Sequence, residues 1–270
     1  MTFARLRFDA ALAILKRDAR IFMSYRGRFF GQVFSGFFSV AVFFYVSRLV
    51  STESFHSSNQ YFAFVVVGLA TFGILTSTLV SLPSDIRQEL VAGTFERILL
   101  SPFGAVWAIV SMTIFPFVMA LTGGLVTLML ARLAFGMPIE WQTAWLGIPV
   151  VFLGALTFVP FGLLAASAAV SAKQATMGVS LIVTGVSFLG GVFFPVALLP
   201  GWIQWTSKVQ PFTPTLDMLR HLLVGTPLHG SAFAALAKMV LFAVCLLPPA
   251  IAALHVAVRV GQRRGTIIEY

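Results

Sequence analysis

Six long apolar segments follow one another along this chain of 270 residues. A helix of about 20 apolar residues is long enough to cross the hydrocarbon core of a lipid bilayer. That core offers no water to bond the backbone, so a helix, which bonds its own backbone, is the simplest structure that spans it. We therefore expect an all-α membrane protein with six transmembrane helices, at residues 29–50, 61–82, 104–131, 143–170, 175–195 and 234–258.

The composition excludes an ordinary soluble domain. Hydrophobic residues make up 59% of the chain and charged residues 10%, whereas a soluble globular domain carries roughly 25% charged residues. No polar stretch is long enough to fold separately. We expect two parts, an N-terminal interfacial helix at residues 1–28 and a transmembrane domain at residues 29–270.

Residues 5–24 predict an amphipathic helix. Its apolar residues recur at spacings of three and four, which places them along one stripe, while basic and acidic residues occupy the remaining face. Such a helix lies in the membrane interface with its apolar stripe toward the acyl chains. A helix docked on a partner protein is the alternative. The stripe consists of Phe8, Leu12, Leu15, Ala19 and Phe22.

The net charge of +9 is spread along the ends of the apolar segments. This distribution favours membrane lipids over nucleic acid as the partner of the basic residues. If the N-terminus is cytoplasmic, thirteen basic residues fall on the inner side and five on the outer side. Because Lys and Arg are enriched in cytoplasmic loops, we expect a multi-pass protein of the inner (plasma) membrane with both termini in the cytoplasm.

The apolar run that follows Gly190 is too long for one simple span. It continues as far as Trp202, and the amphipathic stretch after it, residues 203–223, is interrupted by Pro211 and Pro214. We expect an outer re-entrant helical segment between the fifth and sixth spans, with tryptophan at head-group depth. An ordinary external loop is the alternative.

The segment between the second and third spans concentrates charge of both signs. Gly93 can end one short helix, and Thr94 can cap the next. Two short charged helices at an angle would form a docking surface for a cytosolic partner; a solvated loop is the alternative. The charged residues are Asp85, Arg87, Glu89, Glu96 and Arg97.

Two motifs resemble those of a known family. The first runs from Glu89 to Pro102 (ELVAGTFERILLSP), and the second from Gly191 to Pro195 (GVFFP), followed by LPGW ending at Trp202. Together they resemble the permeases of ABC-2 type transporters, the membrane subunits of ABC exporters. The subgroup most resembled is the short permeases that export drugs, polysaccharides or lipo-oligosaccharides.

This resemblance implies a half-transporter with two kinds of protein partner. One is a second permease copy, in a homodimer or a related heterodimer, and the other is a separate ABC ATPase subunit. The resemblance implies an ATPase-coupling segment containing Glu89, Gly93, Thr94, Phe95, Glu96 and Arg97. It also implies an outer gate containing Phe193, Phe194, Pro195, Pro200, Trp202, Pro214, Asp217 and Arg220.

Asp217 and Arg220 stand three residues apart on a predicted helix and can form an ion pair on one face. Such a pair would either steady the outer helix or contact the substrate.

The sequence lacks the residues of a nucleotide-hydrolysing or other catalytic site. No lysine follows a glycine, and the Walker A loop needs that pair to hold phosphates. The four histidines are scattered without a zinc-site pattern. We therefore expect no enzyme activity and no bound cofactor or metal in this chain, with ATP and Mg²⁺ on the partner ATPase subunit.

The predicted spans contain almost no ionisable residue at mid-depth. Ion-coupled transporters place carboxylates or histidines there, so their scarcity favours ATP-driven movement of an amphipathic or lipid-linked substrate such as a drug, glycolipid or polysaccharide. A secondary transporter or channel is the alternative, and a non-transporting scaffold is a third possibility. Candidate residues of the translocation path are Phe37, Phe44, Thr71, Thr76 and Thr78.

Overall fold

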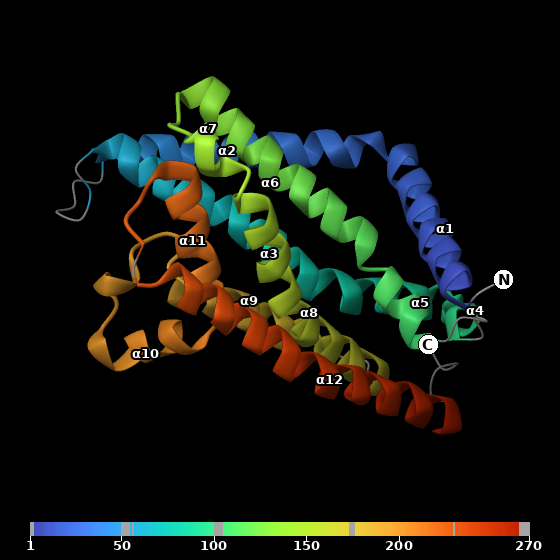
Figure 1. Ribbon diagram of the computed structural model, residues 1–270. Helices are drawn as coiled ribbons and strands as arrows, with labels where there is room; N and C mark the ends of the chain where they lie inside the picture. Colours follow the sequence, from blue (N-terminus) through green and yellow to red (C-terminus); the bar gives the residue numbers. More distant parts are fainter. Residues whose placement is uncertain are drawn as a thin grey trace.

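The computed structural model describes residues 3–49, 55, 57–99, 105–172, 176–228 and 230–264. Within these ranges the regular structure is helical and contains no strand, which confirms the all-α prediction (Figure 1). The helices are α1 (Phe3–Ser24), α2 (Arg26–Leu49), α3 (Ser58–Val91), α4 (Phe95–Leu99), α5 (Ala105–Ser111), α6 (Ile114–Phe135), α7 (Trp141–Ala144), α8 (Gly147–Ala172), α9 (Thr176–Leu189), the 3₁₀ helix η1 (Val196–Leu198), α10 (Gly201–Val209), α11 (Phe212–Val224) and α12 (Ala232–Arg264).

Five stretches of helix in the described residues are long and apolar enough to cross a membrane. They are α2, α3, the pair α5 and α6, α8 and α12. The predicted fifth span coincides with α9, whose 14 residues extend about 21 Å at about 1.5 Å per residue. A bilayer core is about 30 Å thick, so the described part of α9 does not cross it alone. The count of six spans stays a prediction.

The predicted third span is interrupted between α5 and α6. Met112 and Thr113 form the turn, in which their backbone N–H groups donate to Ile109 O at 3.2 Å and Val110 O at 3.1 Å. Pro116 follows as the third residue of α6. Proline is tolerated in a first helical turn, where its missing N–H has no helical partner to lose. The chain therefore changes direction here without losing an interior hydrogen bond.

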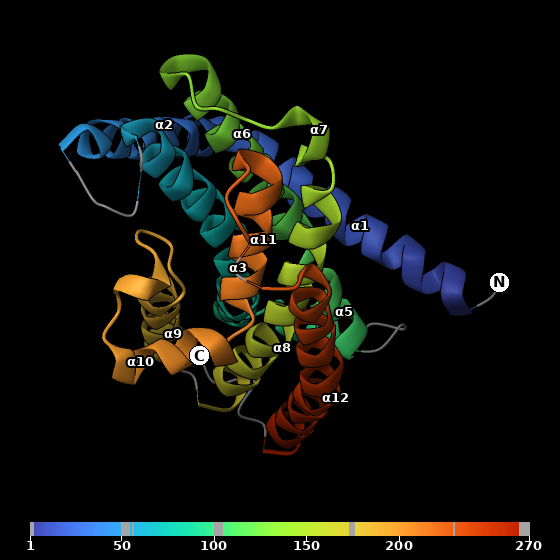
Figure 2. The same ribbon diagram turned by 60° about the vertical axis from the view of Figure 1, so that its left-hand side comes forward.

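Helix α3 forms the centre of the bundle. In its most apolar window 67% of the residues are buried, against 11% for α2. It packs against α8 on one side and α6 on another, and α11 lies alongside it (Figure 2). Leu75, Leu79 and Leu82 are almost fully buried in these contacts. Helices α2, α6 and α8 pack directly against α3, and α12 packs against α8.

The two ends of the bundle carry different elements. The start of α1, α4, α5 and the end of α12 lie at one end, and α10 and α11 lie toward the opposite end (Figure 1). We call these the α4 end and the α11 end. At the α11 end, the backbone N–H of Glu140 donates to Leu223 O at 2.9 Å, and Thr143 Oγ1 donates to Leu222 O at 2.6 Å. These bonds join α7 to the end of α11.

Arg220 fixes α11 against α3. Its side chain is 3% exposed, and its guanidinium lies over the Phe64 ring with Cζ 3.3 Å from the ring centroid. Nε donates to Phe64 O of α3 at 3.1 Å, and Nη2 donates to Val192 O at 2.9 Å. Hydrogen bonds from a charged donor are among the stronger ones in proteins. Arg220 thus ties α11 to α3 and to the chain that follows α9.

Gly68 makes this contact possible. A Cβ at position 68 would lie 2.4 Å from Val192 O and 2.9 Å from Arg220 Nη2. The first of these atoms is backbone, so it cannot move aside as a flexible side chain could. Because glycine has only a hydrogen atom as its side chain, the guanidinium and the Val192 carbonyl can both lie against α3 at this position.

We predict that Gly68→Ala lowers thermal stability and Gly73→Ala does not. The added methyl group at position 68 displaces a buried hydrogen-bonding partner, a change that costs about 1–3 kcal/mol. A Cβ at Gly73, on the same helix, meets nothing within 4 Å, and Ala generally favours a helix over Gly by roughly 0.5–1 kcal/mol. Thermal unfolding of the purified chain in detergent measures the difference. Equal midpoints for Gly68→Ala and the unmodified chain would contradict the role given to this contact.

Candidate functional site

The predicted coupling segment forms a tight turn followed by a short helix. Helix α3 ends at Val91, and Gly93 takes the left-handed conformation with φ of 68°, which glycine adopts at little cost. The Thr94 N–H donates to Glu89 O at 3.0 Å, and α4 then begins at Phe95. The helix is therefore interrupted at Gly93 and Thr94, as predicted, and α4 is a separate helix that does not continue α3.

Helix α4 is held by its first residue and exposes its charge. The Phe95 side chain is 1% exposed and packs in the hydrophobic cluster formed with Ile86, Leu90 and Ile109. The Arg97 side chain is exposed. Only the backbone of Glu96 is described, so its predicted role in the coupling segment lies outside the described side chains. An apolar anchor and an exposed cation thus share one turn of helix.

Glu89 makes its contacts within the chain. One carboxylate oxygen accepts from Arg17 Nη1 of α1 at 3.0 Å, and the other accepts a short hydrogen bond from Thr94 Oγ1. Arg17 Nε also pairs with Asp18 Oδ1 at 2.9 Å. Partial burial lowers the pKa of Arg17, but the hydrogen bonds and negative charges of Asp18 and Glu89 outweigh it and leave that pKa above its ordinary value. Glu89 therefore joins the N-terminal helix to the turn before α4.

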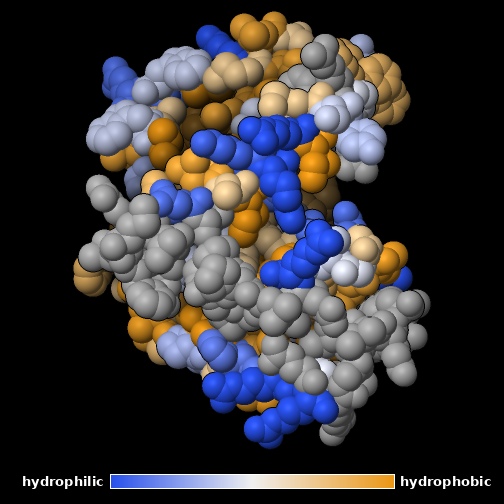
Figure 3. All heavy atoms as spheres, turned by 90° about the vertical axis from the view of Figure 1, so that its right-hand side faces the viewer, coloured by the Kyte–Doolittle hydropathy of each residue, from blue (hydrophilic) through white to orange (hydrophobic). Residues whose placement is uncertain are grey.

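A polar cavity of about 240 Å³ lies beside this pair, between α1, α3 and the α5–α6 turn. Hydrophilic side chains border a hollow on this end of the molecule (Figure 3). Sequence reasoning did not place Arg17 and Asp18 here, although their position on the charged face of an amphipathic helix was the available signal. The polar residues of the cavity wall are Arg17, Asp18, Asp85, Gln88 and Glu89.

The residues of the predicted outer gate lie at the α11 end, in the chain from the end of α9 to α11. Pro195 precedes η1, Pro200 precedes α10, and Pro214 is the third residue of α11. Helix α10 has 9 residues and α11 has 13, so neither reaches across a bilayer core. Phe193 stacks on Phe43 of α2 at 5.7 Å between ring centroids. The segment is thus a series of short elements separated by proline.

Side chains from three elements bond the backbone carbonyls at and just after the end of α9. Ser207 Oγ donates to Leu189 O at 2.6 Å, Arg220 Nη2 to Val192 O at 2.9 Å, and Tyr61 Oη to Phe193 O at 3.3 Å. The last carbonyls of a helix have no partner within it. These bonds allow α9 to stop inside the bundle.

The remaining gate residues occupy different surroundings. Asp217 lies one turn before Arg220 on α11, and its negative charge stabilises the guanidinium. Phe194 is partly buried, and Trp202 on α10 is 76% exposed. The structure therefore separates the predicted gate into a buried contact around Arg220 and an exposed aromatic surface on α10.

The five candidate residues of the translocation path lie on α2 and α3, and their role in a path stays a prediction. Thr71 and Thr78 are buried, and the hydroxyl of Thr78 donates to Ile74 O at 3.2 Å within its own helix. Phe44 packs edge-on against Phe62, with ring centroids 5.4 Å apart. The remaining two are Thr76, whose hydroxyl donates to Phe72 O at 2.6 Å, and Phe37, which is 40% exposed.

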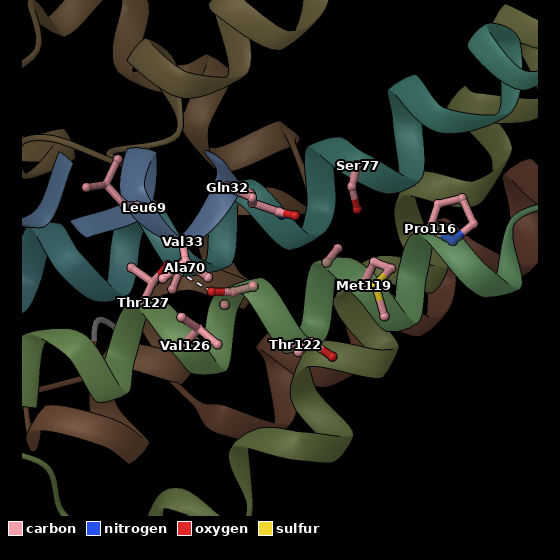
Figure 4. A pocket seen from close by; sticks show the side chains of 15 residues that line it. Gln32, Val33, Leu69, Ala70, Ser77, Pro116, Met119, Thr122, Val126 and Thr127 are labelled. Carbon is pink, nitrogen blue, oxygen red and sulfur yellow. Dashed lines mark hydrogen bonds between the residues drawn. The ribbon is translucent and has the colours of Figure 1, made fainter. Parts of the chain in front are cut away.

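A cavity of about 280 Å³ lies beside these residues, between α2, α3 and α6. Figure 4 shows the side chains of Gln32 and Ser77 extending into the space next to α6. Glycines on all three helices keep the space open, and Gly124 also lets α6 approach Ile74 of α3 closely. The glycines on these three helices were a signal in the sequence, but none of them was predicted as a residue of the translocation path. The small and polar residues of the wall are Gln32, Gly36, Gly73, Ser77, Thr122, Gly123, Gly124 and Thr127.

Among the residues that the structure describes, no group of three or more histidine, cysteine, aspartate or glutamate side chains is placed to hold a metal ion. The acidic residues of the α4 end, Asp18, Asp85 and Glu89, share their cavity with Arg17.

Comparison with known proteins identifies the family. The family model described as ABC-2 type transporter matches residues 12–224. Nodulation protein J of Rhizobium meliloti (strain 1021) is 30% identical over 89 residues, which is 33% of this chain and 34% of that protein. The probable multidrug ABC transporter permease YbhR of Escherichia coli (strain K12) is 26% identical over 174 residues, 62% of this chain and 46% of that protein.

A further relative is matched over a greater share of both chains. Nodulation protein J of Sinorhizobium fredii (strain NBRC 101917 / NGR234) is 23% identical over 188 residues, 67% of this chain and 71% of that protein. In the two relatives above, the matched part spans between a third and a half of their length. The family match covers the residues of both the predicted coupling segment and the predicted outer gate. This chain is a multi-pass membrane protein of the ABC-2 type transporter family, the membrane subunits of ABC transporters.

Proposed function

We propose that this chain is the permease subunit of an ATP-driven exporter, in which a separate ABC ATPase presses on the α4 end. The observation that carries the proposal is the anchored, charged α3–α4 turn in a chain whose sequence contains no Gly-Lys pair for nucleotide phosphates. Energy for the movement of the helices then enters through this turn. A second permease copy completes the transporter.

The exposed side of the α3–α4 turn is suited to an ATPase surface. Arg87 and Arg97 are exposed on either side of the turn, and Val91 is 66% exposed between them. A central apolar contact with a charged rim is the usual composition of a protein interface. Phe95 transmits force from this surface because it is buried among residues of α3 and α5.

The pair of Arg17 and Glu89 couples the N-terminal helix to this surface. Glu89 lies at the last turn of α3 and contacts both α1 and Thr94. A push on α4 therefore displaces α1 and α3 together. In this proposal Glu89 is a positioning residue for the ATPase-facing turn.

The cavity between α2, α3 and α6 is proposed as part of the translocation path. Its wall combines glycine with the polar side chains of Gln32, Ser77 and Thr122, which suits a cargo with both polar and apolar parts. One relative is named as a probable multidrug permease. We propose an amphipathic or lipid-linked cargo, moved outward from the cytoplasmic side of the inner membrane.

We predict that Arg97→Glu reduces association with the ATPase more than Arg48→Glu does. Reversal of a charge at a protein interface opposes binding, and Arg48 is an exposed residue near the far end of α2. The chain is co-expressed with a candidate ABC ATPase subunit from the same organism, and the amount of ATPase that co-purifies is measured. Unchanged recovery with Arg97→Glu, or transport that follows the proton gradient and ignores ATP depletion, would favour a secondary transporter or channel.

We predict that Arg17→Glu and Glu89→Arg each reduce ATPase activity of the complex, and that the double variant partly restores it. Each single change replaces the present ion pair, whose atoms are 3.0 Å apart, by two like charges, whereas the double change reverses the pair. Restoration stays partial because an arginine at position 89 cannot accept the hydrogen bond from Thr94. Additive losses in the double variant would show that the pair does not couple the two helices.

We predict that the cavity between α2, α3 and α6 is open to water in at least one state of the transporter. Cys245 is the single cysteine of the chain and is replaced by serine. Ser77→Cys is then labelled with a water-soluble maleimide in the presence of ATP or ADP. Since a thiol reacts as the thiolate, which needs hydration, we expect faster labelling than at the control Val244→Cys on α12. Equal rates at both positions with either nucleotide would exclude an aqueous path here.

A further inference from the structure

A third cavity, of about 330 Å³, lies between α8, α9, α10 and α12. It shares no lining residue with the cavity between α2, α3 and α6. Its wall is almost entirely aromatic and aliphatic. The side chains that define it are Phe158, Phe161, Ile182, Val186, Val209 and Phe242.

Two polar side chains in this wall already form hydrogen bonds within the protein, which leaves few hydrogen-bond partners for water. Thr206 Oγ1 donates to Ile203 O at 2.7 Å within α10, and Gln210 Nε2 donates to Thr213 Oγ1 at 3.2 Å. A buried water needs two to four polar partners, and its share of liquid volume is about 30 Å³. A cavity of about 330 Å³ with so few polar partners is suited to hydrocarbon rather than to water.

The cavity is open toward the surroundings of the bundle. Of its lining residues, Ile182 is 48% exposed and Trp205 is 61% exposed. The neighbouring surfaces of α9 and α12 expose Leu181 and Val244 at 75% and 64%. In a membrane these surfaces contact acyl chains, so an acyl chain can enter the cavity from the side.

Two lysines lie near the cavity where α10 meets α12. The Lys238 ammonium donates a short hydrogen bond to the backbone carbonyl of Lys208. Lys238 stands one helical turn before Phe242 of the cavity wall, and Lys208 is next to Val209. An ammonium group carries three donors, so Lys238 has donors beyond the one that this carbonyl accepts.

Helix α10 has the pattern of a helix that lies at the boundary between acyl chains and head groups. Trp202, Trp205 and Val209 recur at spacings of three and four on one face, and Lys208 lies off that stripe. Trp202 is 76% exposed. Tryptophan is enriched at this depth of a membrane, and lysine reaches from it toward phosphate.

We propose that this cavity binds one acyl chain of an anionic phospholipid whose phosphate pairs with Lys208 and Lys238. The phospholipid joins α10 to α8, α9 and α12 and holds the outer segment against them. The site is separate from the proposed translocation path, and its occupant is a membrane constituent rather than cargo. It therefore does not rest on the proposed function.

The test uses the full chain with Phe242→p-benzoylphenylalanine, a photoreactive residue of similar shape, in vesicles of equal parts phosphatidylglycerol and phosphatidylcholine. After illumination, mass spectrometry measures the two lipid adducts. Since two lysines favour an anionic head group, we expect the phosphatidylglycerol adduct to exceed the phosphatidylcholine adduct by roughly tenfold. Lys208→Gln with Lys238→Gln should remove this preference, and Lys208→Arg with Lys238→Arg should keep it.

The matched control is Val244→p-benzoylphenylalanine, on the exposed face of the same helix. We expect it to form adducts with both lipids without preference. The proposal is overturned if position 242 forms no lipid adduct, if its preference equals that at position 244, or if the preference persists in the double glutamine variant. The arginine variant shows that loss of the preference in the glutamine variant reflects loss of charge, provided both variants keep the thermal stability of the parent chain.

Discussion

The need to satisfy backbone carbonyls away from water governs the α11 end of this protein. Helix α9 ends among apolar side chains, where an unpaired carbonyl is costly. Ser207, Arg220 and Tyr61 donate to three carbonyls at and after this end. Because these donors belong to α10, α11 and α3, the same bonds that satisfy the backbone also hold these helices against the chain that follows α9. Arg220 adds a bond to Phe64 O, so the segment and the central helix are fixed together.

Helix α3 connects this contact to the opposite end of the molecule. Phe64 and Gly68 near its start contact Arg220, and Glu89 near its end pairs with Arg17. The 34 residues of α3 extend about 51 Å as a continuous helix at about 1.5 Å per residue. In the proposed exporter, a displacement of the α3–α4 turn by the ATPase therefore reaches the segment that follows α9 along a single helix, which contains Pro83 between its two contact regions. The glycine-lined cavity lies along the middle of that same helix.

The site residues divide into those that local sequence could indicate and those that it could not. The interruption before α4 requires a residue in the left-handed conformation, which glycine adopts readily, so it was predictable from Gly93 itself. Glu89 carried a charge in an apolar chain, and it was interpreted as a residue for a partner protein. Within the chain it contacts Arg17, 72 residues earlier, and no local pattern reveals a pair at that separation; its role toward a partner protein stays a prediction. The same reason explains why local sequence did not reveal the cavity between α2, α3 and α6, because three separate helices build its wall.

The sequence by itself determined that the chain is helical, multi-pass and a member of the ABC-2 type transporter family, because length and apolarity of the segments fix what a bilayer permits and two motifs carry the family's pattern. It did not determine the depth of α9, the partner of Glu89, or the role of Arg220. Asp217 was the expected partner on the same helix, whereas the guanidinium also bonds two backbone carbonyls and covers the Phe64 ring. Only the tertiary structure decided these contacts, because they depend on how closely helices that are remote in sequence pack against one another. Gly68 sets that approach between α3 and α11, since its lack of a side chain admits the Val192 carbonyl and Arg220 together.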